Sequence, residues 1–256
     1  MTPHSDEALY AKVSSAGPGA FWALGGPEGL QAGSAASTDA ASTDAASTGA
    51  DADAVHDVAG LAPVLALWPV IGCLVARGEL SLHTPLTAHG PTTHQLLTRG
   101  AADGLPDLVP FVEGLCGAPV ADCAAELVWR PLGMTRTAPG PDGTLRAPLA
   151  DLGRFLGHLL SPADRPVPRA WTAESLRIRT GELTPARGLL WHPGPYGVWS
   201  YGDGPSLLIS PRLKRWAALV PGRGDAGSAA LRTAFREAVF AGDAGEAAEA
   251  AAVVRS

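Results

Sequence analysis

Three polar residues late in the chain carry the side chains of a serine hydrolase triad. His192, Ser200 and Asp203 lie within one short stretch, and a histidine oriented by a carboxylate can take the proton of a serine that attacks an acyl carbon. No Gly-x-Ser-x-Gly turn, which exposes the nucleophile in many hydrolases, supports any serine of this chain. We therefore interpret the three residues as ordinary polar positions and keep Ser200 as an alternative nucleophile.

Three histidines offer a second chemistry, metal binding. His83, His89 and His94 lie in a segment rich in proline, glycine and threonine, where loops could bring their ring nitrogens together. No acidic residue or cysteine accompanies them at helical spacing, as zinc sites usually require. The pattern favours solvated loop histidines and predicts no metal.

A glycine-rich stretch offers a third chemistry, dinucleotide binding. Gly222, Gly224 and Gly227 match the Gly-x-Gly-x-x-Gly pattern between a strand-like run and a helix-like run. That fingerprint opens a βαβ unit, and the sequence after it, GDAGEAAEAAAVVRS, contains no second strand. We expect a tight turn and no cofactor.

Composition limits the function classes. The 256 residues carry a formal net charge of −6, which offers no basic surface for nucleic acid. Cys73, Cys116 and Cys123 lack the short paired spacing of zinc sites and are expected to be free thiols. The segment MTPHSDEALYAKVSSAG has no basic start followed by an apolar stretch, so we predict no secretory signal and a cytoplasmic protein.

The segment from Val58 to Ala76 contains no charged residue and is long enough to cross a bilayer. Pro63 and Pro69 interrupt it, and no basic cluster or aromatic belt flanks it. A buried core helix of a large protein has the same composition. We predict a core helix, with Pro69 as a kink, and retain a single membrane span as an alternative.

The elements that must position these residues form an α+β pattern, with strands at both ends of the chain and helices between them. The repeats of ASTDA at 36–54 predict a flexible low-complexity insertion, and 130–148 is predicted as a loop. The predicted strands are a hairpin within 19–33 and the runs GVWSYGDG, SLLIS and RWAALVPG. The predicted helices are Ser5–Val13, the apolar segment, Thr93–Thr98, Val109–Trp129 in two pieces broken near Gly117, Leu149–Leu160 and Ala230–Phe240.

Five segments, in this order, resemble the serine β-lactamase-like family, which includes class C β-lactamases, penicillin-binding proteins and related esterases. They are DVAGLAPVLALWPVIGCLVARGEL, HQLLT, WRPLGMTRT, LADLGRFLGHLL and PSLLISPRLKRWAALVPGR. The resemblance runs from about Ala20 to Phe240 and is strongest at Pro131–Thr135. It implies one β-lactamase-like domain over 1–256: an antiparallel sheet from 5–35 and 185–242, an inserted helical part at 55–184, and a tail at 243–256.

The resemblance also implies a serine at the start of the apolar helix and a lysine three residues later, on the same helical face. In this chain the two positions fall on Gly60 and Pro63, which can neither attack nor take a proton. A shift by one residue gives Leu61 and Val64, which are equally inert. The sequence contains only two lysines, Lys12 and Lys214, and no Ser-x-x-Lys.

The other two motifs implied by the resemblance are also missing. A Tyr-x-Asn motif is excluded because the sequence contains no asparagine, and the loop that would carry it looks shortened. The strand motif Lys-Thr-Gly or His-x-Gly, which binds a substrate carboxylate and helps to form the oxyanion site, falls on Trp199-Ser200-Tyr201. A short deletion would place it instead at 201–204, and both placements lack the cation.

The sequence therefore predicts a pseudoenzyme of this fold, with a scaffolding role or a small acyl ligand in a remnant pocket. One alternative is an active serine hydrolase with an atypical nucleophile, and the other is a membrane-attached protein.

Overall fold

A computed structural model describes residues 11, 13, 15, 17, 19–34, 52–99, 101–180, 185–222 and 229–253. At 101–104 and 242–253 it describes the backbone alone. Most of the predicted insertion at 36–54 and of the predicted helix Ser5–Val13 lies outside these residues.

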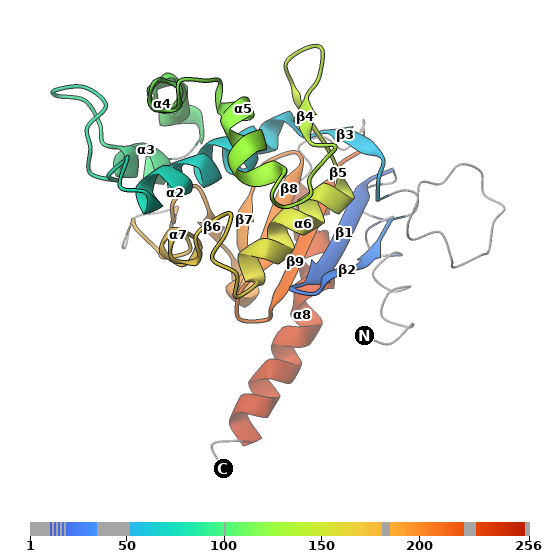
Figure 1. Ribbon diagram of the computed structural model, residues 1–256. Coiled ribbons are helices and arrows are strands. Elements are labelled where there is room, and N and C mark those ends of the chain that lie inside the picture. The colour runs from blue at the N-terminus through green and yellow to red at the C-terminus, as the bar shows by residue number, and fades with distance from the viewer. Residues whose placement is uncertain are drawn as a thin grey trace.

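A six-stranded antiparallel sheet, within the described residues, is built from both ends of the sequence (Figure 1). The strand order is β2-β1-β9-β8-β7-β6, so the predicted N-terminal hairpin lies beside β9, the last strand that the structure describes. This confirms the α+β class. The strands are β1 (Phe21–Gly26), β2 (Gly29–Gly33), β6 (His192–Pro193), β7 (Trp199–Tyr201), β8 (Ser206–Ser210) and β9 (Arg215–Val220).

The two faces of the sheet bury different groups of side chains, because successive residues of a strand point to opposite faces. Along β8, Leu207 and Ile209 pack into the hydrophobic cluster shared with the helical part, whereas Leu208 packs into a second cluster with Phe235. Phe235 belongs to α8 (Ala229–Val253), which continues well beyond the predicted end at Phe240. Figure 1 shows α6 (Leu149–Leu160) on one side of the sheet and α8 starting on the other.

Helix α6 (Leu149–Leu160) lies close to the sheet because it presents glycine there. A Cβ atom at Gly153 would come within 2.8 Å of Cη2 of the fully buried Trp216 on β9. The indole Nε1 of Trp216 donates to the carbonyl of Gly26 at 2.9 Å, which joins β9 to the end of β1.

The remaining helical elements before β6 lie within 55–184, the range predicted as an inserted helical part. The break predicted near Gly117 separates α4 (Ala101–Cys116) from α5 (Val120–Ala124), and α4 begins eight residues before the predicted start at Val109. These elements are η1 (Ala59–Leu61), η2 (Pro63–Leu67), α2 (Trp68–Ala76), α3 (Thr93–Arg99), α4 (Ala101–Cys116), α5 (Val120–Ala124), η3 (Ala125–Trp129) and α7 (Arg169–Ser175). A short 3-10 turn, η4 (Pro195–Gly197), precedes β7.

The irregularity of the apolar helix lies before Pro69 rather than at it. The backbone widens into a π-helical turn at Pro63–Leu67, where the amide of Trp68 donates to the carbonyl of Pro63. Proline has no amide hydrogen, so Pro69 cannot bond the carbonyl of Leu65 four residues back. The indole Nε1 of Trp129 donates to that carbonyl at 2.8 Å, so a neighbouring element satisfies it.

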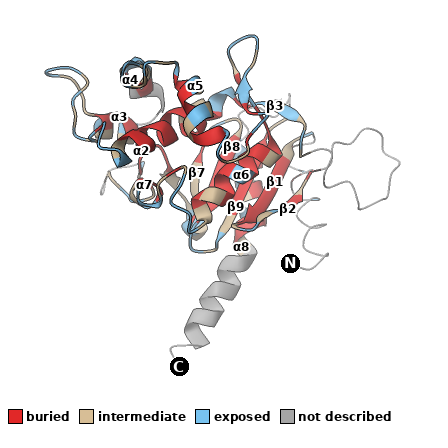
Figure 2. Ribbon diagram, in the orientation of Figure 1, coloured by how far each residue is buried: buried red, intermediate tan, exposed pale blue. Residues whose placement is uncertain are grey.

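The apolar segment is packed inside the protein (Figure 2). Of the described helices, Ala59–Ala76 is long and apolar enough to cross a membrane, and 67% of its residues are buried. A bent pair, Leu105–Cys116 with Val120–Trp129, passes the same test only if it is taken as one span. Packing within the core is enough to explain why this segment is apolar. The sequence alone had left both a core helix and a membrane span open.

The predicted loop at 130–148 contains structure that the sequence did not predict. A small sheet, in the order β3-β5-β4, joins β3 (Val55–Asp57) to β4 (Ala138–Pro139) and β5 (Leu145–Pro148). Asp151 of α6, 1% exposed, accepts hydrogen bonds from the Arg136 amide at 3.0 Å and the Thr137 hydroxyl at 2.9 Å. These bonds anchor the chain just after Pro131–Thr135, the segment in which the family resemblance is strongest.

Candidate active site

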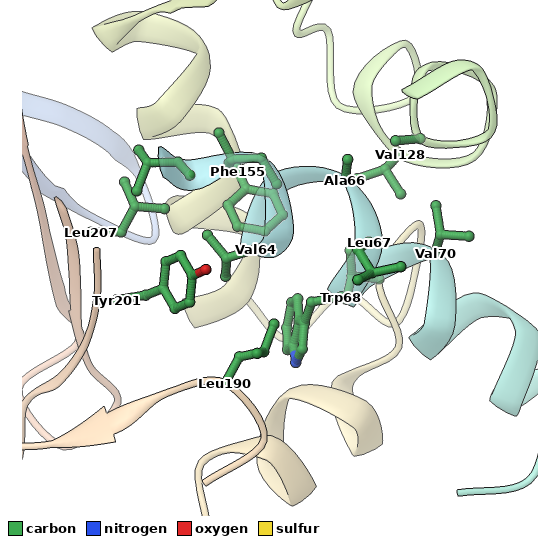
Figure 3. Close-up of a cluster of buried hydrophobic side chains, with 14 of the residues drawn as sticks. Val64, Ala66, Leu67, Trp68, Val70, Val128, Phe155, Leu190, Tyr201 and Leu207 are labelled. Atoms are coloured by element: carbon green, nitrogen blue, oxygen red, sulfur yellow. The ribbon is translucent and has the colours of Figure 1, made fainter. Parts of the chain in front are cut away.

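The head of the apolar helix meets the end of β7, where the family resemblance places the nucleophile and the strand motif. Leu61 and Val64 are each 0% exposed. A Cβ atom at Gly202 would come within 3.0 Å of Cδ2 of Leu61, so this leucine lies directly against the residue that follows β7. Figure 3 shows Val64 facing Tyr201. Hydrocarbon side chains therefore fill the junction between helix and strand.

Gly60 and Pro63, the first placement of the nucleophile and base positions, lie elsewhere on the helix. Gly60 is exposed, and a Cβ built on it would have no described neighbour within 4 Å. Pro63 is half-buried. Neither placement supplies a hydroxyl or an amine, so the chemical conclusion is the same for both.

The strand residues divide between the two faces of the sheet. Trp199 and Tyr201 belong to the hydrophobic cluster shared with the helices, whereas Ser200 lies on the opposite face, paired with Leu208. Tyr201 is 4% exposed, and its ring lies 6.5 Å from that of Trp191. Burial, together with the charge of Asp203, raises the pKa of the Tyr201 phenol far above its usual value. Tyr201 is therefore a neutral core side chain.

His192, Ser200 and Asp203 are near one another, but they do not form a triad. The Ser200 hydroxyl donates to the backbone carbonyl of His192 at 3.5 Å, not to its ring. The ring nitrogen Nε2 of His192 lies 2.5 Å from Nη1 of Arg187, and because a guanidinium can only donate, that nitrogen is occupied as an acceptor. Burial and then the Arg187 charge lower the pKa of His192.

The histidines and the glycine motif that the sequence offered for metal and dinucleotide binding are treated differently by the structure. His83 and His94 stack with ring centroids 5.9 Å apart, and His89 is exposed. In the part of the chain that the structure describes, no group of three or more His, Cys, Asp or Glu side chains is placed to hold a metal. Most of the glycine motif at 222–227 lies outside the described residues.

A polar pocket on the face of the sheet that carries Ser200 was not predicted. It lies between β7, β8 and α8 and includes Ser206, Arg232 and Arg236. The sequence gives only a weak signal for it, which is two arginines four residues apart on a helix. The pocket can be recognised only when the position of α8 over the sheet is known.

Comparison with solved structures identifies the class of fold. The chain is similar to a β-lactamase from Mycobacterium bovis (19% identity, 90% of this chain and 99% of the other, TM-score 0.68). It is also similar to a class C β-lactamase from Rhodobacter sphaeroides (12%, 93% and 99%, TM-score 0.68) and to a D-alanine carboxypeptidase from Burkholderia cenocepacia (12%, 92% and 99%, TM-score 0.67). The chain therefore has the fold of serine β-lactamases and penicillin-binding proteins, as the sequence predicted. No family model and no curated protein matches it by sequence.

Proposed function

We propose that this protein is a non-catalytic form of the serine β-lactamase fold, a pseudoenzyme that serves as a binding or scaffolding domain. The observation that carries the proposal is the burial of Leu61 and Val64 against the end of β7. We infer that these two residues, rather than Gly60 and Pro63, occupy the nucleophile and base positions, because they are the pair that faces the strand.

Acyl transfer at this junction requires a hydroxyl that can lose its proton and a basic group that receives it. Leucine and valine supply neither group. An acyl substrate would also have to displace side chains that are packed as tightly as a protein interior, so binding would cost core contacts. We therefore do not expect a small acyl ligand to occupy the remnant site.

An active hydrolase that uses Ser200 is the second candidate, supported by the neighbouring His192 and by the polar pocket that both residues line. The hydrogen bonds oppose it, because the Ser200 hydroxyl is directed to a carbonyl and His192 Nε2 faces a guanidinium. No hydrogen bond in the described structure activates this serine.

Intact-protein mass spectrometry tests both candidates. The purified full chain is incubated with a fluorophosphonate and, separately, with benzylpenicillin, beside a β-lactamase that carries Ser-x-x-Lys as a positive control. We expect an unchanged mass for this protein and a stoichiometric adduct on the control. The variant Ser200→Ala is treated in parallel.

The outcomes separate cleanly. An adduct on the wild-type protein that disappears in Ser200→Ala would establish Ser200 as the nucleophile and end the pseudoenzyme proposal. An adduct that survives the substitution would end it too and would direct peptide mapping to another residue.

We further propose that the protein works in the cytoplasm. Cys73, Cys116 and Cys123 are free thiols, as expected for a reducing compartment. Burial, followed by a hydrogen bond with Cys123, raises the pKa of Cys116 to about 12, which keeps this thiol protonated and unreactive. The apolar segment is used in the core, which favours a soluble protein over a membrane-attached one.

A further inference from the structure

The pocket between the sheet and α8 is a cavity of about 160 Å³. Ser200 of β7 and Ser206 of β8 line it from the sheet, and Arg232 and Arg236 line it from α8. His192 and the exposed Asp203 complete its rim. Tyr201 and Gly202 also line it, so the pocket borders the candidate active site across the end of β7, while Ser200 and Ser206 reach it from the opposite face of the sheet.

Two polar atoms in this pocket are buried without a partner among the described residues. Ser206 is 1% exposed, yet its hydroxyl makes no hydrogen bond, and the same is true of the buried Nε of Arg236. A buried donor that is left unsatisfied costs free energy, so such atoms are normally paired with protein, water or a ligand. Both residues line one cavity, so one occupant can satisfy the two atoms together.

The charged side chains of the pocket indicate whether its ligand is an anion or a cation. Arg232 donates to the backbone carbonyl of Asp203, a neutral group. Within the described chain, neither Arg232 nor Arg236 has a carboxylate oxygen within 4.0 Å. The Asp203 carboxylate on the rim offsets one of the two guanidinium charges, so the lining keeps a net positive charge. The planar guanidinium fork matches the oxygen atoms of phosphate and carboxylate.

The size of the cavity limits the occupant. Sites for drug-sized ligands are usually about 300–1,000 Å³, so this pocket suits a small anion or the anionic end of a larger molecule. Serine hydroxyls can donate to the oxygen atoms that the guanidinium groups do not reach.

We propose that this pocket binds a small oxyanion, either a phosphate group or a carboxylate, through Arg232, Arg236 and Ser206. The site would give a protein without acyl-transfer chemistry a ligand of its own. The inference does not depend on the proposed loss of catalysis, because Arg232, Arg236 and Ser206 are not part of the junction at which Leu61 and Val64 meet the end of β7.

Calorimetry and thermal unfolding of the full chain test the proposal at constant pH and ionic strength. Sodium phosphate is the first probe, acetate and succinate are the carboxylate probes, and sodium chloride is the reference. We expect saturable heat and a raised Tm with phosphate or with a carboxylate, because a ligand that binds only the folded state stabilises it. The probe whose binding saturates shows whether the pocket takes a phosphate group or a carboxylate.

The variants Arg236→Met and Ser206→Ala locate the binding. Arg236→Met removes charge-assisted hydrogen bonds and should weaken anion affinity about tenfold or more. Ser206→Ala removes a buried unsatisfied hydroxyl, so its Tm in chloride should equal or exceed that of the wild type, while the anion-dependent rise in Tm shrinks. This second variant keeps the test valid if Arg236→Met folds poorly.

Arg212→Gln is the matched control, since Arg212 is exposed at the opposite end of β8. It should bind the anion as the wild type does. The proposal is overturned if no probe gives saturable heat or a Tm change relative to chloride. It is also overturned if Arg236→Met and Ser206→Ala retain wild-type affinity, or if Arg212→Gln loses as much affinity as they do.

Discussion

Histidine side chains show how burial changes chemistry at single residues. Burial is the largest influence on the pKa of His94, His158 and His192, and in each case it lowers the pKa below 6.5. Arg179 beside His94 and Arg187 beside His192 lower it further. Nε2 of His158 lies 3.0 Å from the carbonyl oxygen of Val167 and 3.2 Å from its amide nitrogen, and a hydrogen bond with this backbone opposes the effect of burial on the pKa of His158.

These shifts predict acid sensitivity. Between pH 6.5 and the lower pKa values of the folded state, the unfolded chain binds protons that the folded chain does not, so the free energy of unfolding falls as the pH falls. The stabilisation is complete above about pH 7 and is lost progressively as the pH falls below 6.5. Urea unfolding at pH 7.5, 6.0 and 5.0 should show a decreasing midpoint at constant m-value. A midpoint that stays constant or rises over this range would contradict the assignment.

At the residue scale, the sequence alone shows which motifs the chain lacks. The absence of Ser-x-x-Lys and of asparagine needs no structure. The residues that occupy the nucleophile and base positions can be assigned only with a structure, because neighbouring residues on a helix point about 100° apart. The contact of Leu61 with Gly202, together with Val64 facing Tyr201 in Figure 3, indicates which of two adjacent registers faces the strand.

At the scale of elements, periodicity gave the correct hairpin, α6 and the strands β8 and β9, because each carries a strong local pattern. It missed β4 and β5, which are two and four residues long and depend on pairing with β3 rather than on their own composition. The pocket was missed for a related reason, since Ser206 and Arg236 come together only when α8 covers the sheet.

The closeness of α6 to the sheet makes Gly153 a sensitive position. In Gly153→Ala the added methyl group would meet the rigid, buried ring of Trp216 at 2.8 Å. Overpacking of this kind typically costs about 1–3 kcal/mol, and a decrease of that size in the free energy of unfolding should appear in chemical denaturation.

Gly114→Ala is the control for that substitution. Gly114 is an exposed glycine of α4, and a Cβ built there has no described neighbour within 4 Å. Alanine stabilises a helix relative to glycine by about 0.5–1 kcal/mol, so this variant should be slightly more stable than the wild type. If both variants were stabilised, α6 would not approach the sheet as closely as described.

For the whole molecule, the decisive feature is that one hydrophobic cluster belongs to both the sheet and the helical part. Val64 and Trp68 of the apolar segment, Phe155 of α6 and Ile209 of β8 are all members of it. The indole Nε1 of Trp68 also donates to the buried hydroxyl of Ser175 at 3.0 Å. Neither part can therefore lose the apolar segment and keep its core, although the segment is apolar enough to suggest a membrane span.

This shared core predicts that the two parts unfold together in detergent-free buffer. Tryptophan fluorescence, which reports on Trp68 and Trp191 in the core, and far-ultraviolet circular dichroism, which reports on helices, should give coincident denaturation curves. Two separated transitions would mean that the helical part is an independent domain. A protein that needs detergent to remain in solution would mean that Ala59–Ala76 leaves the core for a bilayer, since burial of this segment in the core is what makes its apolar surface compatible with water.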